Sequence, residues 1–95
     1  PMKQTNISLA EAIDVIMASK GKMITVEFTK RTDGTHRVMN CRLGVRKHLT
    51  GEGSKYSFAD KDLIPVFDCK KMAYRVINAR SVKKVRAGGK EYAVK

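Results

Sequence analysis

The segment between residues 64 and 86 is rich in β-branched and aromatic residues. The segment IPVFDCKKMAYRVINARSVKKVR has the pattern of a strand, a tight turn, a strand, one short helical turn and a third strand. β-Branched and aromatic residues of this kind fit a pleated, half-buried surface. They are Val66, Phe67, Tyr74, Val76, Ile77, Val82 and Val85. We therefore expect a compact antiparallel unit around which the remaining chain folds.

A helix is predicted over residues 8–20, ahead of the strands. Ser8 and Glu11 have the spacing of a capping box, and Gly21 can end the helix in a left-handed conformation. One apolar stripe at helical spacing is formed by Leu9, Ala12, Ile13, Ile16 and Met17. Val15 lies off this stripe and widens the apolar face. We expect the helix to cover one open end of a barrel; a contact between two copies of the chain is the alternative.

Two glycine-containing dipeptides predict tight hairpin turns. A two-residue turn at Asp33-Gly34 would pair Phe28 with Met39 and keep the apolar residues of both strands on one face. A three-residue loop with a bulge would shift this pairing.

The second dipeptide, at residues 88–89, precedes the last predicted strand. A two-residue turn there would pair Val85 with Tyr92 and set Arg86 opposite Glu91. The latter pair would form a favourable cross-strand ion pair.

Together these elements predict a mainly β (α+β) chain, an N-terminal helix followed by a small antiparallel barrel of five to six strands. Closure would remove exposed sheet edges, which a short all-β chain needs. We expect one domain, with a disordered tail over residues 1–7, the helix over 8–20 and the barrel over 23–95. No apolar run is long enough to span a membrane.

The charge of the chain is high and uneven. The net charge is +11, and residues 36–95 hold fifteen Lys/Arg against five Asp/Glu. The only acid between residues 64 and 86 is Asp68. The cations of that stretch are Lys70, Lys71, Arg75, Arg80, Lys83, Lys84 and Arg86, and a second basic group contains Arg42, Arg46 and Lys47. Such an excess is the electrostatic footprint of a nucleic-acid-binding protein.

These cations are the predicted nucleic-acid-binding residues, and Tyr56 and Phe58 are candidate stacking residues near the second group. Exposed, the two rings would stack on bases; buried, they would hold a loop against the barrel. RNA or single-stranded DNA fits better than duplex DNA, because no predicted helix carries the basic residues of a groove reader. The alternative is a protein-interaction module that binds an acidic host protein.

Catalytic and metal-binding patterns are not recognisable. His36, Cys41, His48 and Cys69 lack the spacing of a zinc site. Asp68 stands in an acid-x-lysine pattern, as in some metal-dependent nucleases, but an aspartate at this place also starts turns well. We therefore predict a non-enzyme without metal or cofactor. The two cysteines fit buried thiols of a cytoplasmic protein.

Two stretches, FTKRTDGTHRVMNCRLGVRKHL and VFDCKKMAYRVINARSVKKVRAGGKEY, carry a resemblance to a known family. They are similar to small, mostly bacteriophage-encoded proteins described as Sm-like, Src-homology-3-like barrels related to the WYL domain. The similarity spans residues 25–92 and depends on the DG hairpin, the FD…YR…IN spacing and the helical turn at 78–81. It implies a phage accessory protein in the host cytoplasm that binds nucleic acid or nucleotides. Rings formed by Sm-like proteins imply a homo-oligomer.

Overall fold

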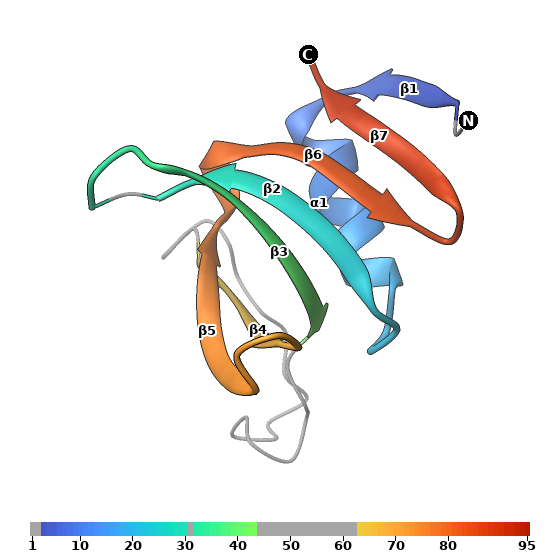
Figure 1. Cartoon of the computed structure of the whole chain (residues 1–95). Helices are drawn as coiled ribbons and strands as arrows, with labels where there is room; N and C mark the ends of the chain where they lie inside the picture. Colours follow the sequence, from blue (N-terminus) through green and yellow to red (C-terminus); the bar gives the residue numbers. More distant parts are fainter. Residues whose placement is uncertain (1–2, 31, 44–62) are drawn as a thin grey trace.

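The computed structural model describes residues 3–30, 32–43 and 63–95, shown in colour in Figure 1. Within these residues the chain forms seven strands, one α-helix and one 3₁₀ turn. In chain order they are β1 (Gln4–Ile7), α1 (Leu9–Ala18), β2 (Ile24–Thr29), β3 (His36–Leu43), β4 (Leu63–Asp68), β5 (Ala73–Asn78), the 3₁₀ turn η2 (Ala79–Ser81), β6 (Val82–Ala87) and β7 (Lys90–Val94).

All seven strands belong to one sheet with the order β1-β7-β6-β2-β3-β4-β5. Neighbours are antiparallel except β1 and β7, which are parallel. The sheet curls, so that β4 and β5 lie beneath β2 and β3 in Figure 1 and β5 comes into contact with β2. Within the described residues it stays open, with β1 and β5 at its two ends. The prediction of a mainly β chain with one helix is confirmed. The prediction of a closed antiparallel barrel of five to six strands is wrong.

Strand β1 corrects the predicted disordered tail over residues 1–7, which is wrong for residues 4–7. β1 pairs with β7 from Gln4 opposite Glu91 to Ile7 opposite Val94. Ile7 joins the core, while the other three residues of β1 are exposed. A mostly polar strand with one buried residue has no clear period-two pattern, so its sequence predicted no strand.

The predicted capping box is present at the start of α1. The Ser8 backbone N–H donates to Glu11 Oε1 (2.9 Å), and the Glu11 N–H donates to Ser8 Oγ (3.1 Å). These hydrogen bonds with Ser8 hold the pKa of Glu11 below its ordinary value. The helix ends at Ala18, two residues earlier than predicted, and Gly21 then has a φ of +91°.

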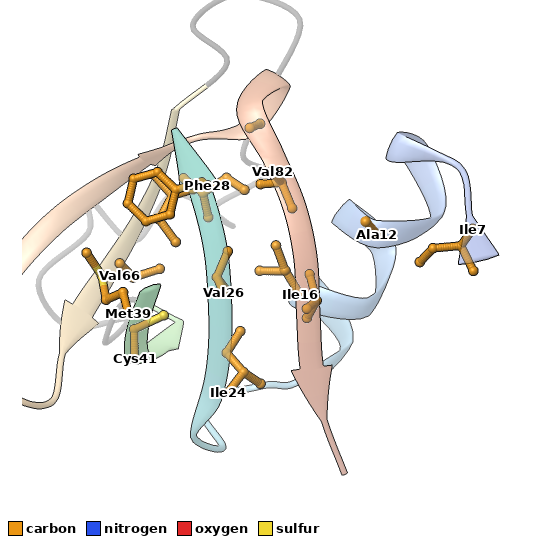
Figure 2. Close-up of a cluster of buried hydrophobic side chains, with 14 residues drawn as sticks. Ile7, Ala12, Ile16, Ile24, Val26, Phe28, Met39, Cys41, Val66 and Val82 are labelled. Carbon is orange, nitrogen blue, oxygen red and sulfur yellow. The ribbon is translucent and has the colours of Figure 1, made fainter. Parts of the chain in front are cut away.

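The apolar stripe of α1 packs on β6 and β7. Ala12 and Ile16 are fully buried, and Val15 also packs against the core. Figure 2 shows Ile16 among the side chains that the strands contribute to this core. The core residues are Ile7, Ala12, Ile16, Ile24, Val26, Phe28, Met39, Cys41, Ile64, Val66, Ile77, Ala79, Val82 and Val85. We call the face of the sheet that carries them the inner face and the opposite one the outer face.

The β2–β3 hairpin has a different register from the predicted one. Phe28 lies opposite Arg37, and Met39 lies opposite Val26. The Lys30 N–H donates to the Thr35 carbonyl oxygen (2.9 Å), and four residues separate Lys30 from Thr35 along the chain. The two-residue turn is therefore wrong. Because the shift is by two residues, every side chain keeps the face that alternation predicted.

Local hydrogen bonds explain the longer connection. The Asp33 carboxylate accepts from the Thr35 N–H (2.9 Å) and from its hydroxyl (2.5 Å). The Gly34 N–H donates to the Lys30 carbonyl oxygen (2.9 Å), and Gly34 has a φ of +73°. An aspartate that bonds the residue two positions ahead competes with the tighter turn.

Replacing Gly34 with valine is expected to lower the free energy of unfolding by about 1–2 kcal/mol. A β-branched residue is disfavoured at positive φ. No atom lies within 4 Å of a Cβ added at Gly34, so a steric clash with a neighbour would not contribute to the loss of stability. Denaturant unfolding measures the change. Thr32→Val is the control, because it places the same side chain at an exposed position of the same connection. Equal stability of Gly34→Val and the wild type would contradict the left-handed conformation.

The other sequence-predicted connections are confirmed. Val85 pairs with Tyr92 and Arg86 with Glu91 across the β6–β7 turn, whose glycines both have positive φ. The helical turn before β6 is η2, whose N-cap Asn78 accepts a hydrogen bond from the backbone of the turn. Between β2 and β6 the register shifts by one residue, so that β6 has one extra residue.

Candidate nucleic-acid interface

An arginine and two aromatic rings form a row on the outer face of β3, β4 and β5. Arg42 lies opposite Phe67, and Phe67 lies opposite Tyr74. The two rings meet edge to face, with centroids 5.1 Å apart and planes at 70°. Tyr74 is 46% exposed, and Arg42 is exposed while its Nε donates to the Gly21 carbonyl oxygen (2.8 Å). That hydrogen bond ties the arginine to the segment after α1.

The turn between β4 and β5 holds two lysines beside this row. Asp68 is buried, and its Oδ1 accepts from the backbone N–H groups of Lys70 and Lys71, both at 3.0 Å. The Met72 N–H donates to the Asp68 carbonyl oxygen (2.8 Å), and Met72 has a positive φ of 56°. Asp68 therefore starts the turn, as one sequence interpretation predicted, and keeps both exposed lysines at its tip.

We call Arg42, Phe67, Lys70, Lys71 and Tyr74 the basic-aromatic surface. Among the described residues, no carboxylate forms an ion pair with its three cations; the pairs that occur involve other residues. Their charge is therefore available to an anionic partner. Lysine and arginine neutralise phosphates, and exposed rings stack on bases.

The remaining cations of the predicted site do not share this surface. Lys84 and Arg86 lie on the outer face of β6, where Lys84 Nζ is 3.4 Å and Arg86 Nη2 3.1 Å from the carboxylate of Glu91. Lys84 Nζ is also 3.9 Å from Glu27 Oε2. The hydrogen bond from Arg86 lowers the pKa of Glu91, and Lys84 adds to this effect. Two glutamates thus balance part of the charge of β6.

Arg75 lies on the inner side of β5, opposite the buried Val66. Its Nε is 3.4 Å from Asp68 Oδ2, so it neutralises the buried carboxylate. Arg80 is exposed in η2, and Lys83 lies at the register shift between β6 and β2 and has no partner in β2. The cations of residues 70–86 are therefore distributed over both faces of the sheet, and Lys84 and Arg86 share the outer one.

Four predicted site residues, Arg46, Lys47, Tyr56 and Phe58, lie outside the described residues. The pair Phe67 and Tyr74 was not predicted as a stacking site, although both rings were assigned to strands. The spacing of the two rings around Asp68 in the sequence could have indicated this pair. A four-residue turn after Asp68 places the two rings opposite each other, and alternation with buried Val66 places them on the outer face.

The residues considered for a zinc site do not converge within the described chain. Cys41 is buried on the inner face, where burial raises the pKa of its thiol to about 12. His36 is exposed on the other face of the same strand, with Nε2 3.3 Å from Glu27 Oε1. His48 lies outside the described residues. In the part of the chain that the structure describes, no three histidine, cysteine or acidic residues gather around one point.

No protein-family model, curated protein or solved structure matches this chain. The similarity to the phage-encoded family therefore stays a prediction. In the described ranges 3–30, 32–43 and 63–95, no helix combines the length and apolar character that crossing a bilayer requires.

Proposed function

We propose that the chain is a binding module for single-stranded nucleic acid, either RNA or DNA, and that the basic-aromatic surface is its contact site. The observation that carries this proposal is the position of Arg42 beside the Phe67–Tyr74 ring pair, with Lys70 and Lys71 at the end of the same strands. Rings on a sheet surface stack on unpaired bases regardless of sequence. The lysines would contact the phosphates, and Arg42 could either stack on a base or hold a phosphate with two hydrogen bonds.

The distribution of charge on the helix supports single strands over duplex DNA. α1 carries Glu11 and Asp14 and no basic residue. Proteins that read the major groove insert a helix with side chains that contact bases and phosphates. An acidic helix would be repelled from the groove, whereas the sheet presents rings and cations together.

Replacing Lys70 and Lys71 with glutamate is expected to weaken binding to all single-stranded sequences by about tenfold or more. The change removes backbone contacts, which carry no sequence information. Fluorescence anisotropy with labelled oligonucleotides at several salt concentrations measures it. If the wild type neutralises about four to six phosphates, its log–log salt slope for single strands should be about −3 to −4, and the variant should have a flatter slope.

The matched control is Lys3→Glu with Lys20→Glu. Both lysines are exposed, and this change alters the net charge by the same amount. Lys83 and Lys84 are less suitable for the test, since a glutamate at position 84 would face Glu27 and Glu91. Equal losses in the two double variants would show a diffuse polyelectrolyte without a defined site. Absence of binding at low salt would contradict the proposal.

A second candidate function is the binding of an acidic protein. Exposed apolar side chains on β5 favour it: Val76 is 53% exposed, and β5 is an end strand of the described sheet. End strands can pair with an added strand from a partner. Pull-down from nuclease-treated lysate separates the two functions, because a protein partner survives nuclease and a nucleic-acid-bridged one does not.

A further inference from the structure

A small cleft lies beside the β6–β7 turn, at the start of β2. Its volume is about 300 Å³, which is at the small end of ligand pockets in proteins. Residues of β2, β3 and β6 line it together with the turn and the residue before β2: Met23, Ile24, Thr25, Asn40, Arg86, Ala87, Gly88 and Gly89. The register explains the site, since Thr25 lies opposite both Asn40 and Arg86.

Asn40 and Arg86 bring hydrogen-bond donors to the cleft. The Thr25 hydroxyl donates to Asn40 Oδ1 (2.8 Å), which uses one of the two lone pairs of the amide oxygen, and the amide N–H₂ group can donate. One nitrogen of Arg86 bonds Glu91 (3.1 Å), and the guanidinium, which is 51% exposed, has further N–H groups to donate. A ligand edge with neighbouring acceptors can therefore bond the guanidinium of Arg86 and the amide N–H₂ of Asn40.

The walls of the cleft suit the face of a flat ring. Met23 is 62% exposed, and Ala87 together with the two glycines leaves the opposite side without bulky side chains. A thioether makes favourable contacts with aromatic rings. The exposed Met23 is the first residue before β2 and would cover the face of a ring inserted between it and the turn.

Arg42 connects the cleft with the basic-aromatic surface. It lies two residues after Asn40 on β3, so both side chains project from the outer face. A strand of nucleic acid on the basic-aromatic surface could therefore place one base in the cleft while Arg42 contacts its phosphate. Because the cleft is small, it suits one base and not a larger group.

We propose that this cleft is a subsite for one guanine base of a bound single strand. The inference rests on the proposed function and adds a base preference to it. Guanine presents two neighbouring acceptors, O6 and N7, and arginine is the commonest side chain that contacts them. Adenine and cytosine place an exocyclic amine, a donor, at the corresponding edge, and this amine cannot accept a hydrogen bond from the guanidinium of Arg86.

The test uses oligo(dA) strands of about ten nucleotides, a length within the site sizes of single-strand-binding domains. One central base is kept as adenine or changed to guanine, thymine or cytosine. We expect the wild-type chain to bind the guanine strand at least about fivefold more tightly than the adenine and cytosine strands. Asn40→Ala should reduce this preference to about twofold or less, and Met23→Ala should weaken binding of the guanine strand.

Val38→Ala is the matched control, because Val38 is 57% exposed on the outer face of the same strand and does not line the cleft. It should leave both affinity and preference unchanged. Thermal unfolding of each variant shows whether a loss comes from the fold.

The outcomes separate the two proposals. Equal binding of all four strands, with the loss caused by Lys70→Glu and Lys71→Glu retained, would overturn the guanine subsite and leave the proposed function intact. If no strand binds, the proposed function fails, and NMR titration with guanosine and adenosine monophosphates decides about the cleft. Shifts confined to residues that line it, larger with the guanine nucleotide, would support the subsite; no shifts would overturn it.

Discussion

Replacing Ile16 with alanine is expected to lower the free energy of unfolding by about 3–4 kcal/mol. The side chain of Ile16 is fully buried, in the layer where α1 packs on β6. Removing a buried aliphatic side chain costs its transfer free energy and leaves a cavity that the surroundings fill only in part. Since small domains are stable by only about 5–15 kcal/mol, this is a large fraction of the total.

Denaturant unfolding of the full chain measures this change. Asp14→Ala serves as the control, because Asp14 is an exposed residue two positions before Ile16 on the same helix. Its effect should be much smaller, since exposed substitutions away from special features change stability little. A loss below about 1 kcal/mol for Ile16→Ala would contradict the packing of α1 against the sheet.

The second large effect is expected for Asp68→Ala, with a loss of about 2–3 kcal/mol. Only 3% of Asp68 is exposed, and its carboxylate accepts two backbone N–H groups of the β4–β5 turn and pairs with Arg75. Removing one partner of a buried ion pair costs about 3–5 kcal/mol when the other charge stays buried. The Arg75 side chain is 42% exposed and can regain water, so we expect a value below that range.

Asp33→Ala is the matched control for this second prediction. Asp33 also begins a hydrogen-bonded turn, but it is exposed and has no ion pair among the described residues. Its replacement should reduce stability much less. Thermal and denaturant unfolding of both variants measure the difference. Equal losses would show that the turn hydrogen bonds, and not burial with Arg75, account for the contribution of Asp68.

Features that depend on neighbours in sequence could be predicted from the residues. The capping box needs only Ser8 and Glu11 three positions apart, and the β6–β7 pairing follows from the glycine pair between two alternating strands. Alternation also assigned the correct faces in β2 and β3, although the hairpin register was wrong by two residues. The competing hydrogen bonds of Asp33 are local too, but they differ little in energy from those of a tighter turn.

Contacts between distant segments were decided by the tertiary structure alone. β1 is ordered because it pairs with β7, which lies more than eighty residues later, and no local pattern encodes that pairing. Similarly, the separation of the cations depends on the partners Asp68, Glu27 and Glu91 that the sheet brings beside them. Composition alone determined that the chain is strongly basic. Only the register across β3, β4 and β5 placed Arg42 beside two aromatic rings. The reason is that hydrogen bonds between strands, and not proximity in sequence, select which side chains become neighbours on a sheet.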